Sequence, residues 1–72
     1  MVTLRDLCRL FLEPDFQRIV VYEVTDDGVS RDLIRGTART VGRSVYGECY
    51  VQVIDSIIDD DDPVLVVCIM TD

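Results

Sequence analysis

The chain has 72 residues, of which 49% are hydrophobic and 29% are charged, a balance typical of a folded domain rather than a disordered tail. A domain of this size buries only about 60% of the surface that its unfolded chain exposes, so we expect a single domain over residues 1–72. The formal net charge is −7, which disfavours nucleic acid and phosphate-rich membranes as partners and favours basic protein surfaces.

The charges are sorted along the chain. Residues 1–30 carry three arginines and six acids, residues 31–47 carry four arginines and one acid, and residues 48–72 carry seven acids and no base. We therefore expect the C-terminal third to form the most acidic surface of the fold.

Residues 3–12 have the pattern of an amphipathic helix. Thr3 is a suitable N-cap, and Asp6 in the first turn opposes the positive end of the helix dipole. Because Pro14 restricts the residue before it to extended conformations, we expect the helix to end near Leu12. Its apolar positions follow the helical spacing: Leu4, Leu7, Cys8 and Phe11.

Residues 18–25 are rich in β-branched and aromatic side chains, which predicts a strand. Asp26, Asp27 and Gly28 then supply a tight hairpin turn, and residues 29–35 form the returning strand. Residues 37–43 form either a short helix capped by Thr37 or an irregular connection.

Two further strands are expected in the C-terminal part. Residues 49–58 alternate, with Cys49, Val51 and Val53 on one face, and residues 64–70 are almost wholly apolar. Residues 59–62 with Pro63 would form the hairpin loop between them, where repelling carboxylates reach water.

This order of elements predicts an α+β fold with two layers, in which the N-terminal helix packs on a mainly antiparallel four-stranded sheet. One helix covers only part of such a sheet, which leaves an open face available for a homodimer unless residues 37–45 cover it. The side chains expected on the open face are Tyr22, Tyr50, Ile54 and Ile58.

Several residue types needed for common chemistry are missing. The chain has no histidine and no lysine, so it lacks the commonest general base, the commonest metal ligand and a phosphate-loop lysine. The aspartate run lacks the glycine and the terminal glutamate of a calcium loop. We therefore expect no enzyme, no catalytic residues, no metal and no cofactor.

The cysteines and the N-terminus point to the cytoplasm. Cys8, Cys49 and Cys68 form no CxxC pair and have apolar neighbours, which is typical of inert core thiols. No apolar run approaches the roughly 20 residues that span a bilayer, and residues 1–6 do not resemble a signal peptide.

The candidate site is a set of exposed acids and one loop tyrosine that would contact a basic partner. Both predicted hairpin tips are acidic, so they form one negative patch if the fold brings them to the same end of the sheet and two separate patches otherwise. Tyr46 is included because tyrosine is a frequent interface anchor. The candidates are Glu23, Asp26, Asp27, Tyr46, Asp55, Asp59, Asp60, Asp61 and Asp62.

Arginines recur at every fourth residue in the segment 31–43: Arg31, Arg35, Arg39 and Arg43. On one continuous helix they would form a basic ridge suited to DNA phosphates, which is the basis for a DNA-binding regulator as one hypothesis. Gly36 and Gly42 interrupt such a helix, and the alternative is that these arginines pair with acids of the same protein.

Residues 3–8 (TLRDLC), residues 18–24 (RIVVYEV), the Asp-Gly turn and residues 35–39 (RGTAR) together resemble small proteins carried by phages and integrated mobile elements. That population includes compact acidic anti-CRISPR proteins. The resemblance implies an inhibitor that occupies the nucleic-acid-binding surface of a Cas effector subunit as a nucleic-acid mimic, in the cytoplasm of the host cell. The alternative hypothesis is a homodimeric structural or accessory protein with no inhibitory role.

Overall fold

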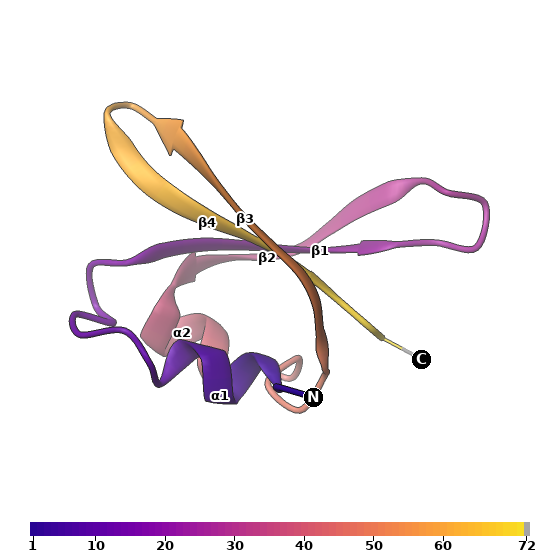
Figure 1. Cartoon of the computed structure of the whole chain (residues 1–72), viewed down its shortest axis with the longest axis horizontal. Helices are drawn as coiled ribbons and strands as arrows, with labels where there is room; N and C mark the ends of the chain where they lie inside the picture. The colour runs from indigo at the N-terminus through magenta and orange to yellow at the C-terminus, as the bar shows by residue number, and fades with distance from the viewer. Residues whose placement is uncertain (72) are drawn as a thin grey trace.

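The computed structural model describes residues 1–71 and contains two short helices and one four-stranded sheet. The α+β fold class expected from the sequence is confirmed, with both helices in one layer against the sheet (Figure 1). The elements in chain order are α1 (Leu4–Cys8), β1 (Arg18–Val24), β2 (Ser30–Thr37), α2 (Ala38–Gly42), β3 (Val51–Asp59) and β4 (Asp62–Ile69).

The start of α1 follows the sequence prediction, but its end does not. The Thr3 side chain accepts a hydrogen bond from the backbone N–H of Asp6 at 3.2 Å, as an N-cap does. The helix ends at Cys8, four residues before the expected end at Leu12. The Leu10 N–H bonds to the Leu7 carbonyl, which tightens the last turn, and beyond it the Leu12 side chain is 97% exposed with no core to pack against.

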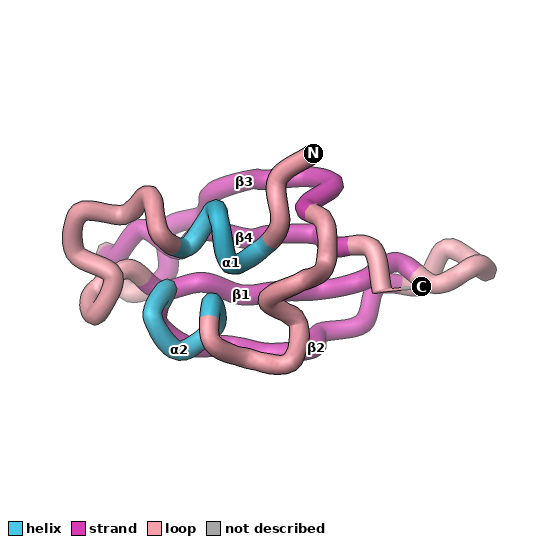
Figure 2. Tube along the Cα trace, turned by 90° about the horizontal axis from the view of Figure 1, so that it is seen from below, coloured by secondary structure: helices cyan, strands magenta, loops and turns pink. Residues whose placement is uncertain are grey.

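Residues 38–42 form the helix α2, which settles the alternative left open for this segment. The Thr37 side chain caps it by accepting from the Thr40 N–H. Figure 2 shows α1 and α2 side by side on the same face of the sheet. The alternative in which residues 37–45 cover the opposite face is therefore wrong for residues 38–42.

The strand order is β2-β1-β4-β3, with antiparallel pairing in the two hairpins and parallel pairing between the central strands β1 and β4. The prediction of a mainly antiparallel sheet holds for two of these three pairings. The parallel central pairing has a direct consequence: the β1–β2 turn and the β3–β4 turn lie at opposite ends of the sheet (Figure 1).

The two hairpin turns differ in their backbone conformations. In the β1–β2 turn only Gly28 has a positive φ, at +82°, and the loop closes where the Thr25 N–H donates to the Val29 carbonyl. In the β3–β4 turn the loop is two residues, Asp60 and Asp61, with φ angles of 52° and 65°. Two positive φ values match the twist of the flanking strands in a tight hairpin. Asp59 and Asp62 belong to the strands as their closing pair, not to the loop as expected.

A register shift in β3 overturns the simple alternation expected there. Val51 pairs with Ile69, while Val53 pairs with Cys68, so Val51 and Val53 lie on opposite faces of the sheet. Ile54, which pairs with Val67, lies on the side of the helices, so its predicted place on the open face is wrong. Tyr22, paired with Cys68, does lie on the open face.

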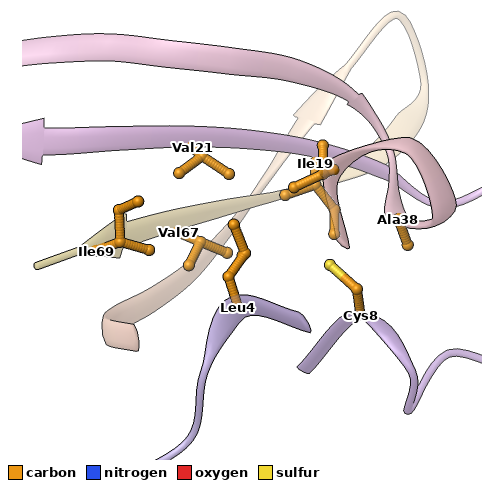
Figure 3. Packing of buried hydrophobic residues seen from close by; sticks show 8 residues of the cluster. Leu4, Cys8, Ile19, Val21, Ala38, Val67 and Ile69 are labelled. Carbon is orange, nitrogen blue, oxygen red and sulfur yellow. The ribbon is translucent and has the colours of Figure 1, made fainter. Parts of the chain in front are cut away.

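The core lies between the helices and the two central strands. Leu4 and Cys8 from α1 point toward the sheet, and Ala38 from α2 belongs to the same buried cluster (Figure 3). The strands contribute the alternate residues Ile19 and Val21 of β1 and Val67 and Ile69 of β4, as parallel register requires. All of these residues are at most 5% exposed, so they form a small hydrophobic core that stabilises the fold by burying apolar surface.

Candidate interaction surface

The β3–β4 hairpin collects five of the predicted site residues on one projecting ribbon (Figure 1). We call this set the acidic hairpin; all its members are exposed, and they are Asp55, Asp59, Asp60, Asp61 and Asp62. Asp60 and Asp61 form the turn itself, while Asp59 and Asp62 pair across its base. The strand pairing thus brings Asp59, Asp60, Asp61 and Asp62 to one end of the sheet, while Asp55 lies halfway along β3, opposite Val66.

Within residues 1–71, one arginine neutralises part of the acidic hairpin. The Arg18 guanidinium lies 3.0 Å from the Asp59 carboxylate, and the other four acids have no arginine within 4 Å. Asp55, which pairs with Val66, accepts a hydrogen bond from the Ser56 backbone N–H at 2.8 Å. The acidic hairpin therefore keeps a strong negative field that its own protein does not cancel.

Most arginines elsewhere are paired with acids. These pairs are Arg5–Glu48, Arg31–Glu23, Arg35–Asp32 and Arg39–Asp15. Arg31 and Arg35 lie on β2, whereas Arg39 lies on α2, so no continuous helix carries the four-residue repeat. The predicted pairing with the protein's own acids is confirmed for Arg31, Arg35 and Arg39 but not for Arg43, which has no acid of residues 1–71 within 4 Å. Exposed pairs of this kind stabilise a fold by only about 0–1 kcal/mol each.

The three predicted site acids of the β1–β2 hairpin, Glu23, Asp26 and Asp27, do not join the acidic hairpin. Glu23 receives hydrogen bonds from Arg31 at 2.6 Å and from Thr71 at 3.1 Å, and its side chain is only 12% exposed. The Arg31 hydrogen bond lowers the pKa of Glu23, and the bond from the Thr25 hydroxyl lowers the pKa of Asp27. These acids form a separate, partly neutralised group at the other end of the molecule.

Tyr46 is not a free contact residue. It is half-buried and packs against the core, because the loop that contains it folds back onto α1. The N–H groups of Leu4 and Arg5 donate to the carbonyls of Cys49 and Gly47, which fixes that loop. Tyr46 is therefore less exposed than a free loop residue would be, and its role as an interface anchor stays a prediction.

The open face of the sheet carries a hollow that sequence reasoning missed. Its volume is about 510 Å³, with an apolar floor from Val20 of β1 and Val66 of β4 and a side wall from Ile57 of β3. The ion pairs Arg18–Asp59 and Arg35–Asp32 stand at its margin. The residues that line the hollow come from all four strands, so no single segment of the sequence contains the whole site. The sequence shows only that β-branched residues alternate within individual strands. It places apolar surface next to the base of the acidic hairpin.

The cysteines occupy both sides of the sheet. Cys8, the last residue of α1, is buried in the core, and this burial raises the pKa of its thiol, which keeps it neutral at pH 7. Cys68 is buried on the open face, with its Sγ 3.6 Å from the Gln52 side-chain oxygen. In residues 1–71, no group of three potential ligands is placed to hold a metal ion.

Comparisons with known protein families, with curated proteins and with solved structures found no match for this chain. Neither helix within residues 1–71 has the length and apolar character that crossing a membrane requires. The candidate surface therefore has to be interpreted from its own geometry and charge.

Proposed function

We propose that this chain is a small acidic protein-interaction module without enzymatic activity, which binds a basic surface of a partner protein through the acidic hairpin. The observation that carries the proposal is a cluster of acids that have no arginine within 4 Å: Asp60, Asp61 and Asp62 are consecutive at the β3–β4 turn, and Asp55 lies on β3, farther from the turn. The other acids of residues 1–71 without an arginine partner are dispersed or lie at the opposite turn: Asp6, Glu13, Asp26 and Asp27. A concentrated field of this kind accelerates encounter with an arginine-rich or lysine-rich groove.

The partner class that we propose is a Cas effector subunit, with the carboxylates occupying positions that nucleic-acid phosphates take, as in an anti-CRISPR protein. The two turns lie at opposite ends of the sheet, so Asp26 and Asp27 cannot belong to the same surface as the acidic hairpin. The proposed contact with the partner is therefore limited to the acidic hairpin. In this proposal only the β3–β4 hairpin imitates nucleic acid: it inserts into a groove of the partner, and the apolar hollow lies beside it. The proposed compartment is the cytoplasm of the host cell, and the buried cysteines Cys8 and Cys68 suit its reducing conditions.

The test is competition between this protein and guide RNA or target DNA for purified Cas effectors. The variant is Asp60→Asn/Asp61→Asn, since asparagine tolerates positive φ and removes two charges without disturbing the turn. The matched control is Asp26→Asn/Asp27→Asn, which removes two charges from the opposite turn. We expect the first variant to bind at least about tenfold more weakly, mostly through a slower association rate, and the control to retain binding.

Two outcomes would contradict the proposal. If the wild-type protein does not displace nucleic acid from any effector at low salt, the proposal that it mimics nucleic acid is wrong. If both double variants weaken binding equally, the net charge of the molecule acts instead of the acidic hairpin.

A second candidate function is a homodimeric accessory protein that associates through the outer edge of β3. This strand lies at the edge of the sheet. At its first residue the Val51 N–H donates to the Val2 carbonyl of the N-terminal segment. Large apolar side chains along β3 are about half exposed or more: Val53, Ile54, Ile57 and Ile58. An open apolar edge is a template for strand pairing.

Sedimentation equilibrium at high micromolar concentration tests this candidate. An edge-paired dimer should dissociate in the variant Ile54→Lys/Ile58→Lys and persist in Val29→Lys, which alters an exposed apolar residue of the other hairpin. A wild-type protein that is strictly monomeric would exclude this function.

A further inference from the structure

A cleft of about 310 Å³ lies between α1 and α2, separate from the acidic hairpin. Figure 2 shows the two helices that enclose it lying next to each other. Its apolar part comes from Cys8, Ala38 and Pro14. Four of the seven arginines also line it, two from each helix and its C-cap: Arg5, Arg9, Arg39 and Arg43.

The arginines are four residues apart on both helices, and this spacing brings each pair to one helix face. Two of them are neutralised from outside the cleft: Arg5 pairs with Glu48, and the Arg39 Nε lies 2.5 Å from the Asp15 carboxylate. Arg9 and Arg43 are exposed, and within residues 1–71 neither has an acid within 4 Å. The cleft therefore has an excess of positive charge.

This excess is notable in a protein with twice as many acids as arginines. The other five arginines all have acidic partners, whereas the two without one line the same cleft. The floor adds no opposing charge, because Ala38 and Gly42 are uncharged and the buried Cys8 thiol is neutral. An anion bound between two guanidinium groups lowers the repulsion between them.

We propose that this cleft binds a small organic phosphate, with Arg9 and Arg43 as a two-guanidinium clamp. The planar donors of arginine match phosphate oxygens, and two of them balance a phosphate dianion. The volume exceeds that of a phosphate group, so the organic part of the ligand lies against the apolar floor of Cys8, Ala38 and Pro14. The net charge of −7 disfavours a long polynucleotide but acts less on a small ligand inside the cleft.

The test is titration of the full chain with inorganic phosphate, pyrophosphate and AMP, followed by calorimetry and by amide chemical shifts. We expect AMP to bind more tightly than inorganic phosphate and to shift the amides of residues 5–9 and 38–43. In Arg9→Gln/Arg43→Gln, affinity should fall by at least about tenfold, because charge-assisted hydrogen bonds are lost. The control Arg31→Gln/Arg35→Gln removes the same number of charges from β2 and should change affinity by less than about twofold.

Each alternative result decides against the proposal. Absence of binding by all three probes at millimolar concentration and low salt would exclude the site. Equal weakening in both double variants would show a general electrostatic effect rather than a clamp. Tighter binding of a single-stranded oligonucleotide than of AMP would show that the arginines serve a polynucleotide. Both sites of substitution are exposed, and an unchanged circular dichroism spectrum confirms that the variants are folded.

Discussion

At the scale of single residues, Gly42 is a position where close packing of the two helices requires glycine although glycine disfavours a helix. A Cβ atom added at this position would lie 2.8 Å from the Cβ of the buried Cys8, where α1 and α2 meet. Alanine normally stabilises a helix by about 1 kcal/mol relative to glycine. Because the clash strains the core, we expect Gly42→Ala to lower the free energy of unfolding by about 1–3 kcal/mol in urea denaturation.

Gly36 provides the matched control for this prediction. A Cβ added there meets its nearest atoms, in Thr40, at 3.7 Å, which is an ordinary contact. Gly36→Ala should therefore be neutral or slightly stabilising, since it reduces the freedom of the unfolded chain. A Gly42→Ala protein as stable as Gly36→Ala would contradict the close approach of the two helices.

The pairing of Glu23 predicts a pH dependence of stability. The hydrogen bond from Arg31 lowers the pKa of Glu23 in the folded state, so the unfolded state binds a proton more readily as the pH falls. The stabilisation is complete above the ordinary glutamate pKa and is lost as the pH falls through the lowered value. In thermal melts at stepwise lower pH, Glu23→Gln and Arg31→Gln should both show a shallower loss of stability than the wild type. Slopes identical to the wild type in both variants would show that this pair is not formed.

At the scale of elements, the β3–β4 turn has a sequence that does not suit its backbone. Asp60 and Asp61 both have positive φ, and such positions favour Asn-Gly. We expect Asp60→Asn/Asp61→Gly to raise the free energy of unfolding by about 1 kcal/mol, because it relieves backbone strain and carboxylate repulsion. The same pair of changes at Asp26 and Asp27 should give no such gain, since φ is positive there only at Gly28. A destabilised Asp60→Asn/Asp61→Gly hairpin in urea denaturation would contradict this turn conformation.

Local features of these elements were predictable from the sequence. Thr3 and Thr37 cap the two helices, and the β-branched runs form strands close to the expected positions. The end of α1 was not predictable, because periodicity continues to Phe11 while the helix itself stops at Cys8. The β3 register shift was also hidden, since a one-residue slip changes the face of each following side chain without changing the composition.

At the scale of the whole molecule, the candidate site depended on a pairing that no local pattern encodes. Each hairpin follows from adjacent segments, but the parallel contact between β1 and β4 joins residues more than 40 positions apart. This contact separates the two acidic turns and leaves the four-strand hollow on the open face. Sequence reasoning therefore identified the acidic residues of the C-terminal segment but not which of the acids share a surface.

The separation of charge across the whole molecule also predicts how binding responds to salt. The turn of the acidic hairpin lies at one end of the sheet, whereas Arg9 and Arg43, which have no acid of residues 1–71 within 4 Å, line the cleft between the helices. At physiological ionic strength salt screens charges that are more than about 8 Å apart. Salt therefore weakens the long-range attraction of a basic partner more than the short-range contacts of the bound complex. Between about 0.05 and 0.5 M salt, the association rate with such a partner should fall by about tenfold or more, with little change in the dissociation rate. Stopped-flow measurements on the wild type and on Asp60→Asn/Asp61→Asn test this, and the variant should have the weaker salt dependence. Equal salt dependence in the two proteins would mean that the encounter is steered by charges outside the acidic hairpin.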